Sequence, residues 1–222
     1  MTENTKIRKI ATTNGFSLLE LLVVILILGV LSAMAIPGWV SMQKSLRLSG
    51  DAHGISEALN IAKMRAAAKF TETRVFFYTG TNPYFRLDIW NRTKNCWVAD
   101  GDTSTNPTCI IPTTITNTET SLSKGVIWGT GSITAALPDT SPMPPIGANC
   151  RQGQTAPTKT DGSAISSTAC IQFNSRGFPY PSAAAGLYIT DGTRVFGSMT
   201  NAMGLVHTYE ISASGSTTWT PQ

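Results

Sequence analysis

Apolar residues are concentrated near the N-terminus, in two stretches that differ in period. Phe16 to Ile36 is apolar apart from a few small residues and Glu20, and as a helix it would be about 31 Å long, enough to cross the hydrocarbon core of a bilayer. Gly38 to about Phe70 is amphipathic instead, with an apolar stripe at helical spacing made of Ile55, Leu59, Ala62 and Ala66. This pattern predicts a long helix whose second half packs on a sheet.

After Phe70 the hydrophobic period changes from helical to alternating, which predicts short β-strands. Gly, Asn, Asp and Pro separate the alternating runs, which lie at residues 74–80, 84–90, 125–129, 170–174, 187–192, 194–197 and 205–212. The Asp-Gly pair within Thr190–Arg194 predicts a tight hairpin. Two segments rich in Ser, Thr, Pro and Gly, about residues 100–124 and 137–168, are expected to be long surface loops. A helix followed only by strands predicts an α+β domain with an antiparallel sheet on the helix.

The length of 222 residues fits one domain with an appendage. The chain has 17 Lys and Arg against 13 Asp and Glu, and Lys6, Arg8, Lys9 and Glu3 all precede Gly15. Without that leader 14 basic and 12 acidic residues remain, a net charge of +2. This balance gives no electrostatic indication of a dedicated nucleic-acid binder.

Four cysteines, all beyond residue 95, suggest an exported domain. An even number with no C-x-x-C pair, placed after a membrane-type segment, predicts disulfides rather than four unrelated buried thiols. Four cysteines allow three connectivities, and sequence alone does not choose among them. We expect the pairing of sequence neighbours, because each bond would then tie one loop-rich insertion; the pairs would be Cys96–Cys109 and Cys150–Cys170.

The apolar N-terminal segment has two conventional interpretations. Basic residues precede it, so the positive-inside rule places the N-terminus in the cytoplasm and the residues after Trp39 outside, as in a single-pass anchor. Alternatively it is a secretory signal peptide cut after Ala33–Ala35, which fits the small-x-small pattern. Both leave Glu20 unexplained, because a charged acid inside a spanning helix costs roughly 2.5–3.5 kcal/mol.

The stretch GFSLLELLVVILILGVLSAMAIP, residues 15–37, resembles the type IV pilin signature, also called the prepilin or class III signal. The resemblance implies that a membrane peptidase cleaves between Gly15 and Phe16 and methylates the new amino group. Glu20 of one subunit would then pair with the charged Phe16 amino group of a neighbour inside a filament core, since an unpaired buried ion costs several kcal/mol. Pro37 should kink or loosen the helix, with melting between Gly29 and Pro37 in filaments, or else it ends the helix.

Three further segments resemble the branch of the family that contains FimT and the H-type pseudopilins of type II secretion. They are residues 55–77, a helix leading into the first strand; residues 170–196, a strand, an Arg-Gly turn and a hairpin; and residues 206–219, a last strand and tail. The resemblance covers the mature chain discontinuously, with the two Ser/Thr-rich segments as insertions. It implies a minor subunit at or near the tip of a type IV pilus or a type II secretion pseudopilus.

Some FimT proteins bind DNA during natural transformation through a basic Gly-Arg-x-Arg element in the tail. The matching tail here, Ser214–Gln222, contains neither arginine nor lysine, so it cannot supply the phosphate contacts on which sequence-independent DNA affinity depends. Arg176 and Arg194 are the remaining candidates for DNA contact, and isolated arginines are usually solvated or paired. We therefore expect DNA not to be the partner.

No catalytic or metal-binding constellation stands out. His53 and His207 are the only histidines, and neither has a second ligand at metal-binding spacing. The chain has no G-x-S-x-G elbow and no phosphate-binding glycine loop. We expect no enzyme activity, no metal and no cofactor; the alternative from another functional class is a secreted enzyme behind an ordinary signal peptide.

The sequence thus predicts four segments and a localisation. They are a cleaved basic leader at residues 1–15, a transmembrane and filament-core helix at 16–37, an amphipathic helix at 38–70 and a β-rich pilin head at 71–222. The expected partners are other pilin or pseudopilin subunits, the prepilin peptidase, the inner membrane and the pilus or secretion assembly platform. The protein would lie in the bacterial inner membrane with the leader cytoplasmic and the head periplasmic, and would then enter a filament.

Overall fold

A computed structural model describes residues 15–101, 109–110, 118–138, 149–153, 162–180, 185–212 and 217–222. The basic leader predicted at residues 1–15 lies outside the described residues except for Gly15. The chain forms two compact units, Met1–Gln43 and Lys44–Gln222, and one helix contributes to both. Each unit is described separately below.

Helix α1 extends from Leu18 to Lys69. At its start the Leu21 N–H donates to the Ser17 carbonyl at 3.1 Å, the first i→i−4 bond of the helix. At its end Phe70 takes a left-handed conformation with φ 49°, and the Thr71 N–H donates to the Ala66 carbonyl at 3.3 Å. These features form a Schellman-type C-cap, with phenylalanine at the position usually taken by glycine.

The helix is not interrupted at Pro37, which lies within α1. The alternative in which Pro37 ends the helix is therefore wrong for this structure. Melting between Gly29 and Pro37 was expected only in the assembled filament and stays a prediction. Proline removes one backbone donor, so the hydrogen-bond ladder of α1 lacks one bond at this position.

The second unit contains two antiparallel sheets, where the sequence predicted one. The first sheet has the order β3-β2-β1-β6-β7, with β4 pairing with β2. Its strands are β1 (Thr73–Tyr78), β2 (Tyr84–Asn91), β3 (Cys96–Ala99), β4 (Thr120–Ser121), β6 (Thr168–Phe173) and β7 (Pro179–Tyr180). The second sheet has the order β11-β10-β9-β8-β5. Its strands are β5 (Ile127–Trp128), β8 (Ala185–Thr190), β9 (Arg194–Thr200), β10 (Val206–Ser212) and β11 (Thr220–Pro221).

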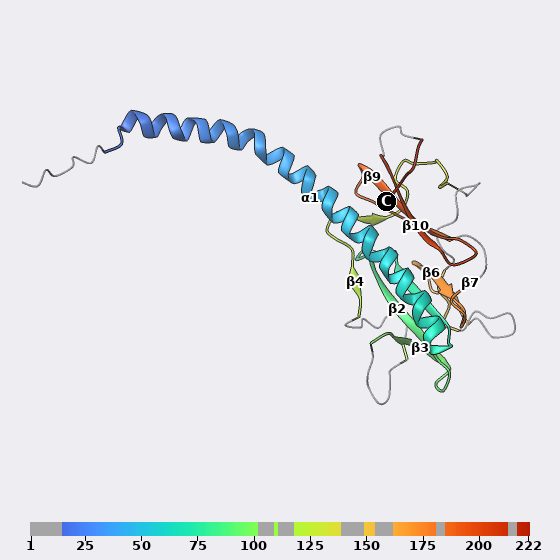
Figure 1. Ribbon diagram of the computed structural model, residues 1–222. Coiled ribbons are helices and arrows are strands. Elements are labelled where there is room, and N and C mark those ends of the chain that lie inside the picture. Colours follow the sequence, from blue (N-terminus) through green and yellow to red (C-terminus); the bar gives the residue numbers. More distant parts are fainter. Residues whose placement is uncertain are drawn as a thin grey trace, which may run out of the picture. The chain divides into compact units, whose positions relative to one another are not determined.

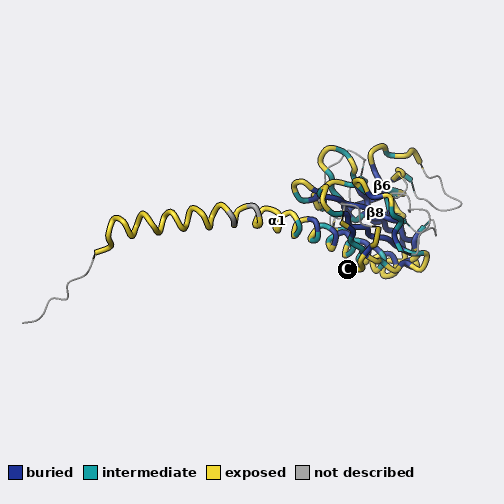
Figure 2. Tube along the Cα trace, turned by 90° about the horizontal axis from the view of Figure 1, so that it is seen from above, coloured by how far each residue is buried: buried dark blue, intermediate teal, exposed yellow. Residues whose placement is uncertain are grey.

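The main core lies between α1 and the two sheets (Figure 1). The predicted apolar stripe of the helix is buried, and Leu48 and Ala52 extend it toward the N-terminus. The stripe packs on residues from both sheets, among them Val75, Phe77, Ile171, Phe173, Leu187, Ile189 and Phe196. Figure 2 shows this change along α1, from exposed positions in the first unit to buried ones in the second. The α+β pilin-like fold predicted from the sequence is confirmed.

The outer faces of the sheets are also buried. On the second sheet Tyr188, Val195, Met199 and Ile211 form a separate cluster, which Ile133, Leu137 and Trp219 cover. Burial raises the pKa of Tyr188 to about 12, since the phenolate would be poorly solvated there. Strands β8 and β9 are consequently buried at almost every position, without the alternation of a sheet that has one face in water.

Two disulfides tie loop segments to the first sheet, as expected for an exported domain. Cys96, at the start of β3, bonds to Cys109, and Cys150 bonds to Cys170 in β6. The 149–153 segment is further fixed to the sheet, because the Arg151 carbonyl accepts from Arg74 Nη1 at 2.6 Å and the Gly153 carbonyl accepts from Trp97 Nε1 at 3.1 Å. The disulfides therefore hold covering segments over the outer face.

Candidate functional site

The N-terminal motif lies at the very start of α1. Gly15, Phe16 and Ser17 precede the helix, and the Phe16 side chain is 84% exposed. Glu20 lies in the first helical turn and is exposed. A carboxylate is favoured there, because the unpaired N–H groups at a helix N-terminus give it a partial positive charge. The motif thus presents an aromatic residue and an acid at an exposed helix end.

The apolar segment that follows is exposed on all sides. Its large side chains, from Leu18 to Leu31, are between 45% and 83% exposed. Within the described residues α1 is the one helix apolar and long enough to cross a membrane, and none of its most apolar stretch is buried. Contiguous apolar surface of this extent is rare on a soluble monomer and marks contact with lipid or with another protein.

Within the described residues nothing packs closely against Gly29. A Cβ atom added at Gly29 would meet nothing within 4 Å, and the same holds for Gly15 and Gly38. Glycine inside a helix costs about 1 kcal/mol relative to alanine, so Gly29 weakens α1 without any contact in return. Within the described residues no packing contact at Gly29 offsets this cost.

Comparison with known protein families gives a match at this site. Residues 11–36 match the prokaryotic N-terminal methylation motif. The matched segment includes Gly15, Phe16, Glu20 and Gly29. The match supports a type IV pilin-like or pseudopilin subunit, and it points to a structural protein rather than an enzyme. Comparison with curated proteins and with solved structures found no match.

The head contains a buried ion network that was not identified from the sequence. Arg74 Nε lies 2.8 Å from one oxygen of Asp88, and Arg86 Nε lies 3.0 Å from the other. Arg86 Nη1 also lies 3.0 Å from Glu119 Oε1. Arg86 is 1% exposed and Asp88 is 0% exposed. Desolvation by burial lowers the pKa of Arg74, and the Asp88 carboxylate opposes this shift.

Aromatic rings surround the two guanidinium groups. The Arg74 guanidinium lies 4.3 Å from the centre of the Trp97 ring, and the Arg86 guanidinium lies 4.3 Å from that of Phe76. The sequence did contain a signal, because Arg86 and Asp88 are two residues apart and therefore on one face of a strand. The buried charges join β1 to β2 and connect both strands to the segments at Glu119 and Arg151, which makes them part of the architecture of the head.

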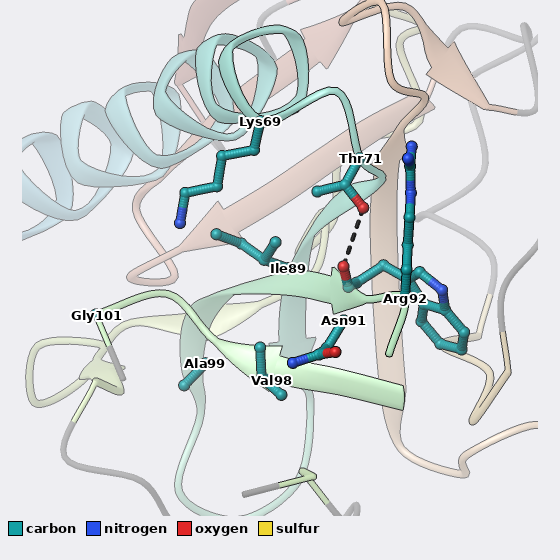
Figure 3. A pocket seen from close by; sticks show the side chains of 9 residues that line it. Lys69, Thr71, Ile89, Asn91, Arg92, Val98, Ala99 and Gly101 are labelled. Atoms are coloured by element: carbon teal, nitrogen blue, oxygen red, sulfur yellow. Dashed lines mark hydrogen bonds between the residues drawn. The ribbon is translucent and has the colours of Figure 1, made fainter. Parts of the chain in front are cut away.

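A pocket lies where α1 meets the first sheet (Figure 3). It is lined by Lys69, Thr71, Ile89, Trp90, Asn91, Arg92, Val98, Ala99 and Gly101. The Thr71 hydroxyl donates to the Trp90 carbonyl at 2.9 Å, and Lys69 lies 3.7 Å from Asp100. Among the described residues that line the pocket there is no histidine, cysteine or carboxylate, and the one amine, Lys69, pairs with Asp100.

The remaining candidates from the sequence are dispersed. His53 and His207 are exposed, and within the described residues no group of three His, Cys, Asp or Glu side chains could hold a metal ion. Arg176 is exposed in the turn between β6 and β7. Arg194 starts β9 and pairs with Glu210 at 2.7 Å, so its charge is partly neutralised. Within the part of the chain that the structure describes, no hydrogen bond or ion pair joins Arg176 and Arg194.

Proposed function

We propose that this chain is a minor structural subunit of a type IV pilus or of a type II secretion pseudopilus. The observation on which this rests is the N-terminal methylation motif at residues 11–36, placed at the start of a helix whose large apolar side chains from Leu18 to Leu31 are all exposed. The minor role and the FimT or H-type branch rest on the resemblance of the three segments at 55–77, 170–196 and 206–219.

Processing separates the leader from the subunit. Cleavage between Gly15 and Phe16 leaves a charged, N-methylated amino group at the end of the helix. The leader before it is cytoplasmic, the segment 16–37 spans the inner membrane, and the head is periplasmic. The amphipathic half of α1, residues 38–70, belongs to the head.

Assembly moves the apolar helix from lipid into a bundle of like helices. Glu20 then pairs with the Phe16 amino group of a neighbouring subunit, because neither charge has another partner in an apolar core and an unpaired buried ion costs several kcal/mol. Gly29 and Pro37 weaken the helix between them, which allows this segment to loosen inside the filament.

The decisive experiment is mass spectrometry of the native N-terminus. A chain that begins at N-methylated Phe16 supports the proposal, and a chain that begins at Ile36 would indicate an ordinary signal peptide. Incorporation of Glu20→Ala into filaments tests the pairing, with Glu20→Gln separating loss of charge from loss of size. Filaments that contain either variant at the wild-type level would refute the pairing mechanism.

A further inference from the structure

A basic cleft lies in the second unit, apart from the N-terminal motif. Lys44 and Arg47 of α1 line it together with Lys124, which lies in the turn before β5. Gly125, Val126 and Asp191 complete the lining. Three cations against one carboxylate leave a formal excess of two positive charges in one depression.

The turn that contains Lys124 is fixed to the helix. Asp51 accepts hydrogen bonds from the Ser123 N–H at 2.8 Å and from the Ser123 hydroxyl at 3.0 Å. The Val126 N–H donates to the Ser123 carbonyl at 3.0 Å, and Gly125 has φ +92°, as the third position of a type II turn requires. Lys124 is therefore held in a defined place by a carboxylate of α1.

Asp51 fixes this turn on the helix face that carries the other two cations. Lys44, Arg47 and Asp51 are spaced i, i+3 and i+7, so their side chains lie on one face of α1. Lys124 is distant from them in sequence and reaches the cleft only through the fold. The three cations are thus gathered by the structure and are not a run of basic residues.

The three cations are available to a ligand. All are exposed, and within the described residues none of them has a hydrogen bond or an ion pair. The pocket of Figure 3 differs, because Lys69 pairs with Asp100 and Arg92 donates to the Phe70 carbonyl. Asp191 Oδ1 is engaged within its own turn, where it accepts from the Thr193 and Arg194 N–H groups, while Asp191 Oδ2 is buried without a hydrogen-bond partner among the described residues.

The cleft also lies close, along the chain, to the end of the apolar run. Lys44 follows Ile36 by eight residues in the sequence of α1. Trp39 lies between them and is 65% exposed, and tryptophan is enriched where a membrane meets water. Lysine and arginine side chains can extend their charged ends toward the headgroups from such positions.

We propose that the cleft of Lys44, Arg47 and Lys124 binds the phosphate of an anionic phospholipid headgroup. This rests on the proposed function, because it requires residues 16–37 to span a bilayer. The headgroup holds the head against the membrane surface before assembly, and this contact breaks when the subunit leaves the bilayer. Entry into a filament therefore competes with lipid binding.

Native mass spectrometry of the full-length protein in detergent tests the proposal. The protein is offered phosphatidylglycerol and phosphatidylcholine in equal amounts, and the number of each lipid retained is counted. We expect a preference for phosphatidylglycerol that falls about fivefold in Lys124→Gln, since one cation near anionic lipid is worth about that factor. Arg176→Gln, which removes an equally exposed cation outside the cleft, should leave the preference unchanged.

Asp51→Ala distinguishes an arranged site from general attraction. It removes a negative charge near the cleft, so attraction by net charge alone predicts more bound phosphatidylglycerol. Loss of the clamp on Ser123 predicts less, as our proposal requires. More binding in Asp51→Ala, equal retention of both lipids, or wild-type behaviour of Lys124→Gln would each overturn the proposal.

Two further readouts from the same samples keep the interpretation clear. Thermal unfolding midpoints establish that the variants are folded, and the N-terminal mass reports processing at Phe16. A methylated Phe16 without a lipid preference would overturn the lipid site and leave the proposed function intact. Salt-sensitive binding of a short DNA duplex that Lys124→Gln abolishes, without a lipid preference, would assign the cleft to nucleic acid instead.

Discussion

Arg74 and Asp88 lie directly opposite each other on strands β1 and β2, and their side chains form an ion pair of 2.8 Å inside the head. The second oxygen of the same carboxylate pairs with Arg86. One buried acid therefore contacts both buried guanidinium groups, and Glu119 supplies a second carboxylate at Arg86. Removing one partner of a buried pair costs more than the pair itself contributes, because the remaining charge stays desolvated.

Asp88→Ala is accordingly expected to be among the most destabilising substitutions in the head. It would leave Arg74 without its carboxylate partner and deprive Arg86 of one, at a cost of about 3–5 kcal/mol in the free energy of unfolding. Denaturant titration of the processed protein in detergent, followed by tryptophan fluorescence, measures this cost.

The matched control for Asp88 is Glu210, which forms a partly exposed ion pair with Arg194. Glu210→Ala should cost less than about 1 kcal/mol, because water screens that pair. Similar losses in the two variants would show that burial of the network does not determine its importance.

The helix and the strands were largely predictable, because their periods are strong signals. The apolar stripe from Ile55 to Ala66 is buried as expected, and the Asp-Gly turn at Asp191 joins β8 to β9 as a tight hairpin. The strands β3, β4, β7 and β11 were not predicted. Strands β4, β7 and β11 have two residues each, which is too short for any alternation to be visible, and the four residues of β3 are all apolar and do not alternate either.

The division into two sheets and the coverage of their outer faces could not be derived from local pattern. Leu137 belongs to a Ser/Thr-rich segment expected to be a surface loop, yet it is 1% exposed and covers the second sheet. The basic cleft was missed for a similar reason, since Lys124 joins Lys44 and Arg47 only after folding. The spacing of apolar residues predicts which face of a helix or strand is buried. It does not predict which distant loop covers that face.

Gly204 provides a prediction about close packing of two turns. It has φ +74°, and a Cβ atom added there would lie 3.0 Å from the Gly177 carbonyl oxygen. Gly204→Ala should therefore lower the free energy of unfolding by about 1–2 kcal/mol, because alanine is strained in a left-handed conformation. The close contact with the Gly177 backbone should lower it further. The free energy of unfolding in denaturant measures the sum.

Gly192→Ala isolates the contact from the conformational cost. Gly192 has φ +86°, and nothing lies within 4 Å of its added Cβ atom. Gly192→Ala should lower the free energy of unfolding only through the strain of a left-handed alanine. Gly204→Ala should therefore be the more destabilising of the two variants. Equal losses would mean that the neighbouring turn moves away without cost.

The Cys150–Cys170 disulfide should contribute substantially to the stability of the head. It joins residues 20 positions apart, for which loop-closure entropy predicts about 3 kcal/mol. The double variant Cys150→Ala and Cys170→Ala should lose an amount of this order in denaturant titration. Tryptophan emission should also shift, because Trp97 donates to the Gly153 carbonyl in the segment that this bond holds.

Reducing the disulfides of the wild-type protein provides a comparison for the double cysteine variant. If the disulfide acts on the 149–153 segment as the structure indicates, thiol reductant should destabilise the wild type and have a smaller effect on the double variant. The remaining effect would then come from the Cys96–Cys109 bond. A double variant as stable as the wild type would contradict the entropic estimate.

Asp191 should give the head a stability component that depends on pH. Burial raises the pKa of its carboxyl, but hydrogen bonds from Thr193 and Arg194 outweigh burial and hold the pKa below 3.8. Because the folded-state pKa is lower than the unfolded one, this stabilisation is fully present above about pH 4 and is lost as the pH falls further.

Asp191→Ser keeps an acceptor oxygen but does not titrate. Between pH 6 and pH 3 the wild type should therefore lose more unfolding free energy than Asp191→Ser, since all other acids are common to both. Parallel losses in the two proteins would show that the turn is held without help from the charge.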